Sequence, residues 1–88
     1  MGAAKIKVKA GLTVEGLIEK LIKTPGPRII LDIAEDATLF DNEINLRLIK
    51  FYAEEKDKEL IINSNDPVLN GLAHQFGIAT LKEARVAL

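Results

Sequence analysis

The sequence lacks several features that point to particular functions in other proteins. It contains no cysteine and no tryptophan, and aromatic residues make up only 5% of the chain. The absence of cysteine excludes disulfide bonds and thiolate metal sites. No apolar run approaches the roughly 18 residues of a membrane-spanning helix, and no signal-peptide pattern is visible near the N-terminus. We therefore expect a cytoplasmic protein that does not bind or cross a membrane.

An excess of charge of one sign is also lacking. The chain has 12 basic and 13 acidic residues, which leave a net charge of −1. Nucleic acids and anionic membranes attract proteins with a basic excess, so the near balance argues against both as partners. With 48% hydrophobic residues, the composition is that of a folded domain. We expect one domain over residues 5–88, preceded by a flexible tail at 1–4.

Three segments have the residue patterns of β-strands. Residues 5–10 alternate between lysine and an apolar residue, which is typical of a strand with one buried face. Lysines also protect exposed sheet edges, so we place this strand at an edge. Residues 28–33 and 59–63 are aliphatic runs of the kind found in parallel sheets. A fourth, very short strand is expected at 78–80.

Helical patterns follow the strands. Thr13 is a suitable N-cap for a helix that ends before Thr24, and Asp41 or Asn42 is suitable for a helix that reaches about residue 55. The Asp66-Pro67 pair starts a third helix, and a last short helix is expected at 81–88. The expected core residues of the first and third helices are Val14, Leu17, Ile18, Leu21, Ile22, Val68, Leu69, Leu72, Ala73 and Phe76.

The order of these elements predicts the fold class. Strands and helices alternate, which is typical of an α/β domain with parallel strands and right-handed crossovers. We predict a sheet of three or four strands in a two-layer or three-layer sandwich, equivalent to half of a Rossmann-type domain. A chain this small is then a minimal fold, a module of a longer protein, or a subunit that oligomerises.

The helix over residues 42–55 has apolar residues on two sides. Its expected core stripe is Ile44, Leu48, Phe51 and Tyr52, which recur at helical spacing. Leu46, Ile49 and Ala53 then lie partly outside that stripe. Either the helix is buried more deeply than usual, or these three residues form an exposed surface for self-association or for docking a protein partner. We take them as the candidate interface.

Polar residues follow the second and third strands, where ligands bind in open α/β sheets. Asp36 and Asp41 follow the second strand, and Asn63 and Asp66 follow the third. With Glu35, the carboxylates could hold Mg²⁺ or Ca²⁺, because both cations prefer oxygen ligands. Helix capping explains most of the same residues without a ligand. We take Asp36, Asp41, Asn63 and Asp66 as ligand-binding candidates and assign no metal or cofactor.

No set of residues has the pattern of a catalytic site. His74 is the only histidine, and a catalytic or zinc-binding role needs partners that the chain lacks. Ser64 has no nucleophile-elbow glycines around it, and no phosphate-binding glycine motif is present. We expect His74 to be a surface residue and the protein not to be an enzyme.

Parts of residues 28–78 resemble a recurrent bacterial pattern. The matching segments cover roughly half of the chain and are Ile29-Ile30-Leu31, Asn45-Leu46-Arg47-Leu48-Ile49, Tyr52-Ala53-Glu54, Lys58-Glu59-Leu60-Ile61-Ile62, Asp66, Leu72-Ala73 and Gly77-Ile78. They are similar to the small α/β domain at the N-terminus of some baseplate-J-like proteins and of other uncharacterised bacterial proteins. Asn45 is the most specific position, because patterning alone does not require a polar residue there. The resemblance implies a structural or assembly module without catalytic residues.

Two hypotheses for function follow. The first is a non-enzymatic interaction or assembly module that uses Leu46, Ile49 and Ala53. The alternative is a domain that binds a small ligand or a divalent cation at the carboxyl ends of the strands.

Overall fold

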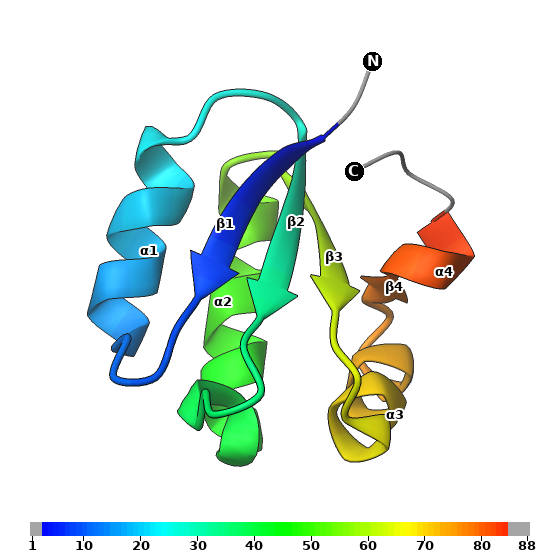
Figure 1. Cartoon of the computed structure of the whole chain (residues 1–88). Coiled ribbons are helices and arrows are strands. Elements are labelled where there is room, and N and C mark those ends of the chain that lie inside the picture. Colours follow the sequence, from blue (N-terminus) through cyan, green and yellow to red (C-terminus); the bar gives the residue numbers. More distant parts are fainter. Residues whose placement is uncertain (1–2, 85–88) are drawn as a thin grey trace.

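The computed structural model describes residues 3–84, which fold as alternating strands and helices (Figure 1). The elements are β1 Ala4–Val8, α1 Val14–Lys23, β2 Arg28–Ile33, the 3₁₀ turn η1 Leu39–Asp41, α2 Glu43–Glu55, β3 Glu59–Asn63, α3 Pro67–Gln75, β4 Ala79–Thr80 and α4 Leu81–Ala84. None of these helices is long and apolar enough to span a membrane.

The sheet is parallel throughout, with its strands in the order β1-β2-β3-β4. This order confirms the predicted α/β class and the edge position of β1. Right-handed crossovers between strands in sequential order place the connecting helices on the same face of the sheet. In the structure, α1 and α2 lie together on one side of the sheet (Figure 1).

One hydrophobic cluster fills the space between the sheet and the helices on this side. Alternate strand residues enter it from β1, β2 and β3, and α1, α2 and α3 also contribute side chains. Ile6 and Val8 are buried there as predicted, while the lysines beside them are exposed. Ile30 and Ile61 pair in register but lie outside this cluster, because they point to the opposite face.

The helix starts follow the predicted capping chemistry. The Thr13 side chain accepts a hydrogen bond from the Gly16 N–H at 3.0 Å. Of the two candidates for α2, Asn42 is the N-cap. For α3, Asp66 accepts from the Val68 N–H at 2.9 Å. These contacts satisfy backbone donors that the first helical turn leaves free.

The predicted orientation of α2 is wrong. Leu46 and Ile49 are fully buried and Ala53 is 1% exposed, so the three candidate interface residues belong to the core. The predicted core stripe faces outward instead, with Ile44 60%, Leu48 39%, Phe51 56% and Tyr52 37% exposed. Packing explains this choice, because Ala53 lets the helix approach the sheet more closely than an aromatic pair would.

Smaller differences concern the other helices. Ile22 of α1 and Val68 of α3 were expected in the core, but both are exposed. Leu17, Leu21, Leu69 and Ala73 are buried as predicted. Of the helix expected at 81–88, the structure describes α4 Leu81–Ala84, and residues 85–88 lie outside the described residues.

Candidate functional site

The outward side of α2 carries a row of four large apolar side chains, which we call the α2 stripe: Ile44, Leu48, Phe51 and Tyr52. They recur at i, i+4, i+7 and i+8, so they line one side of the helix over its whole length. The rings of Phe51 and Tyr52 pack edge to face, with centroids 5.6 Å apart. A helix on the surface of a monomer normally presents polar residues there, so the stripe is an interaction-site candidate.

Charged residues run along the side of α2 that faces the end of α3. The Arg47 guanidinium lies 4.9 Å from the centroid of the Phe76 ring. The Lys50 ammonium donates a hydrogen bond to the Phe76 carbonyl. Lys50 therefore contacts the end of α3 and does not pair with Glu54, which lies four residues later on α2. Within residues 3–84, neither Arg47 nor Glu54 forms an ion pair.

Asn45 has a structural explanation that patterning did not supply. Its side-chain amide donates a hydrogen bond to the Leu39 carbonyl at 2.7 Å. This bond ties η1 to the first turn of α2, and Leu39 and Phe40 of η1 are buried. The polar residue at the margin of the apolar face thus holds the loop that covers one end of the core.

A cavity of about 460 Å³ lies at the carboxyl ends of β1, β2 and β3. Most of its lining side chains are apolar, and its polar residues include three carboxylates but no cation. The lining residues are Val8, Ile33, Ala34, Glu35, Ala37, Leu39, Phe40, Asp41, Ser64, Asn65, Asp66, Val68, Leu69 and Leu72. Its volume is within the usual range for small-molecule sites, roughly 300–1,000 Å³.

The four ligand-binding candidates do not come together in this cavity. Asp41 and Asp66 line it, but Asp36 is exposed and does not. Asn63 is also outside the lining, since its amide donates to the Asp32 carboxylate at 3.1 Å on the neighbouring strand. Asp66 is occupied as the α3 N-cap. In the range 3–84, no group of three or more His, Cys, Asp or Glu residues is placed to hold a metal ion.

The sheet lacks the strand-order reversal at which open α/β sheets usually bind ligands. In open α/β sheets, ligands bind where the strand order reverses and the helices on either side part. The order β1-β2-β3-β4 has no such reversal. The cavity is formed instead between the loop around η1 and the start of α3.

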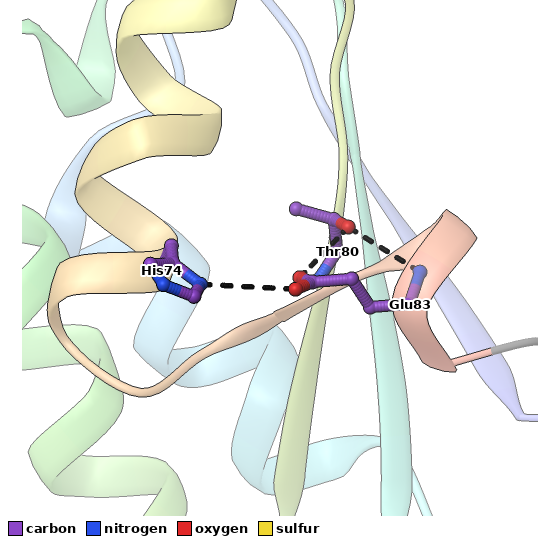
Figure 2. A network of polar contacts seen from close by, with 3 residues as sticks. All are labelled: His74, Thr80 and Glu83. Carbon is purple, nitrogen blue, oxygen red and sulfur yellow. Dashed lines mark hydrogen bonds and ion pairs between the residues drawn. The ribbon is translucent and has the colours of Figure 1, made fainter.

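His74 belongs to a polar network that joins α3 to α4 (Figure 2). The Glu83 carboxylate accepts hydrogen bonds from the Thr80 backbone N–H and hydroxyl, both at 3.0 Å. These bonds lower the pKa of Glu83. His74 Nδ1 is 3.7 Å from the second carboxylate oxygen, and its side chain is exposed as predicted. Thr80 and Glu83 form a capping box at the start of α4, which accounts for the network structurally.

Comparisons of the chain with protein-family models, with curated proteins and with solved structures found no match. The resemblance to the N-terminal domain of baseplate-J-like proteins therefore stays a prediction.

Proposed function

We propose that this domain is a non-enzymatic interaction or assembly module, and that it binds a protein partner through the α2 stripe. The observation that carries the proposal is the exposure of four large apolar side chains along the helix between α1 and α3. Their burial against a protein would remove this apolar surface from water, which is the main favourable term in association. Tyr and Phe are also among the residues enriched in interfaces.

The residues in and beside the α2 stripe also favour a role in binding a protein partner. Arg47, beside the stripe, is held against the Phe76 ring, so less of its rotamer freedom is lost on binding. Phe51 and Tyr52 already pack against each other. Rigid aromatic anchors with a charged margin have the usual arrangement of a protein-binding surface.

Site-specific photo-crosslinking tests the proposal in the cells that naturally produce the protein. Phe51 is replaced by p-benzoyl-phenylalanine, which keeps an aromatic ring at the stripe. The control carries the same group at Lys7, an exposed position on β1. We expect protein adducts from position 51 and few from position 7. Equal adducts from both positions, or none from position 51, would contradict the proposal.

The cavity favours a second candidate function, the binding of a small ligand. Its apolar walls and separated carboxylates suit an organic molecule better than a bare divalent cation, which needs several converging oxygen ligands. NMR titrations with Mg²⁺ and with a library of small organic molecules test this. Shifts at residues 34–41 and 64–72 support a site there. Unchanged spectra at millimolar concentrations of all of them would exclude it.

A further inference from the structure

Two of the exposed charges on α2 have a spacing that matters for association. Arg47 and Glu54 are seven residues apart, so they lie on the same flank of the α2 stripe, two turns from each other. Both are exposed, and neither forms an ion pair in the described part of the chain. From Arg47 to Glu54 the flank thus runs from a positive to a negative charge, and Glu43, one turn before Arg47, adds a second acidic residue on the same flank.

Two copies of such a flank are complementary when the helices run antiparallel. In a symmetric dimer, the same surface of each copy meets the other about a two-fold axis. Antiparallel helices that face each other bring like flanks together. An axis level with residues 49–51 places Leu48 against Phe51 of the second copy. The same axis places Arg47 beside Glu54 of the second copy, and symmetry repeats each contact.

A parallel pairing does not use these charges. In parallel helices, a residue on one flank meets the opposite flank of the partner helix, about five residues further along. Arg47 would then face Tyr52, and the acidic residue nearest to Tyr52 along that side, Glu55, lies almost one turn further along the helix. The charge pattern of α2 therefore favours the antiparallel arrangement.

We propose that the α2 stripe binds a second copy of this chain, with the two α2 helices antiparallel and Arg47 of each copy paired with Glu54 of the other. This inference rests on the proposed function, because it names the partner of the same surface. It commits to self-association on the ground that the surface is complementary to itself in charge and in its apolar row.

The expected size of the contact sets the expected affinity. A standard interface buries about 800 Å² on each partner, whereas α2 is only about 20 Å long. A contact of standard size therefore needs the edges of α1 and α3 in addition to α2. We expect a dimer that dissociates in the micromolar range and is absent at high dilution.

Charge exchange tests the pairing in the purified chain. Sedimentation velocity is measured for the wild type, Arg47→Glu, Glu54→Arg and the double variant from a few micromolar to about a millimolar. Each single variant places like charges opposite each other twice, and we expect dimerisation to weaken by about tenfold or more. The double variant restores both pairs with reversed polarity, and we expect its affinity to return to within about threefold of the wild type.

Two controls make the outcome specific. Lys7→Glu makes the same reversal of charge as Arg47→Glu but on β1, and it should leave dimerisation unchanged. Far-UV circular dichroism of every variant shows whether the fold is kept.

A second test removes the apolar contact. A variant with Leu48→Gln and Phe51→Gln should remove dimerisation without changing the charge.

The outcomes separate this inference from the proposed function. A wild type that stays monomeric at a millimolar overturns self-association, while adducts with other proteins at position 51 would still support the module. A dimer that needs Leu48 and Phe51 but is not rescued by charge exchange overturns the antiparallel pairing alone. A dimer that is insensitive to Leu48→Gln and Phe51→Gln uses another face, which contradicts the inference and also removes self-association as support for the α2 stripe.

Discussion

The orientation of α2 can be tested by making the same substitution on its two sides. Ile49 is fully buried and Ile44 is 60% exposed, so Ile49→Ala and Ile44→Ala differ only in where the side chain lies. Leu46→Ala and Leu48→Ala form a second matched pair, buried against partly exposed. Each pair compares the same loss of side-chain atoms inside and outside the core.

The expected magnitudes follow from burial. Truncating a buried Ile or Leu to Ala costs about 2–5 kcal/mol, because transfer energy is lost and a cavity is left. We expect about 3 kcal/mol for Ile49→Ala and for Leu46→Ala. A domain of this length has a total stability of roughly 4–13 kcal/mol, so either change removes much of it. Ile44→Ala should change stability by about 0.5 kcal/mol or less, and Leu48→Ala by about 1 kcal/mol or less.

Urea unfolding followed by far-UV circular dichroism is the suitable assay, since the chain has no tryptophan. Each variant is measured at two concentrations that differ tenfold, because a contribution from the proposed dimer would make the unfolding midpoint depend on concentration. In thermal unfolding, about 3 kcal/mol corresponds to a fall in Tm of roughly 12–24 °C for a domain of this size. If Ile44→Ala or Leu48→Ala destabilises more than its buried counterpart, the assigned orientation of α2 is refuted.

Three further predictions concern local structure. Asp66→Ala removes the α3 N-cap and should cost about 0.5–2 kcal/mol in urea unfolding, with Asp66→Asn much milder. Gly77 has a φ of +74°, so Gly77→Ala should destabilise by about 1 kcal/mol, whereas Gly71→Ala, inside α3 with open space around it, should stabilise by up to about 1 kcal/mol. The Thr80 hydrogen bonds lower the pKa of Glu83 below its ordinary 4.5, so their stabilising effect is present above that pH and is lost as the pH falls through the lowered pKa. The Thr80 amide resonance should titrate with this lowered pKa in NMR spectra, and an unchanged titration in Glu83→Gln would contradict the assignment.

The elements of the fold were predictable because their signals are local. A cap acts over two or three residues, as in Thr13 and Asp66, and strand alternation is visible within the five residues of β1. Gly77, which has a positive φ, directly follows the C-cap of α3, where glycine is common. The edge position of β1 also followed from its own lysines, and the sheet order confirms it.

The candidate site was only partly predictable. The loops after β2 and β3 do contribute Asp41 and Asp66 to the cavity, as their position after parallel strands suggested. Asn63 does not take part, because its amide is bonded to Asp32 across the sheet. That contact joins residues 31 positions apart, and nothing in the local sequence around either one indicates it.

The sequence by itself determined the class of this protein: the alternation of strands and helices, their starts and ends, and the balance of charge. Only the tertiary structure decided which side of α2 meets the sheet. The helix has apolar residues on both sides, so its periodicity allows two orientations. Close packing selects the one in which Leu46, Ile49 and Ala53 fit against the strands. The larger side chains of the α2 stripe are left outside, where the proposed interaction surface lies.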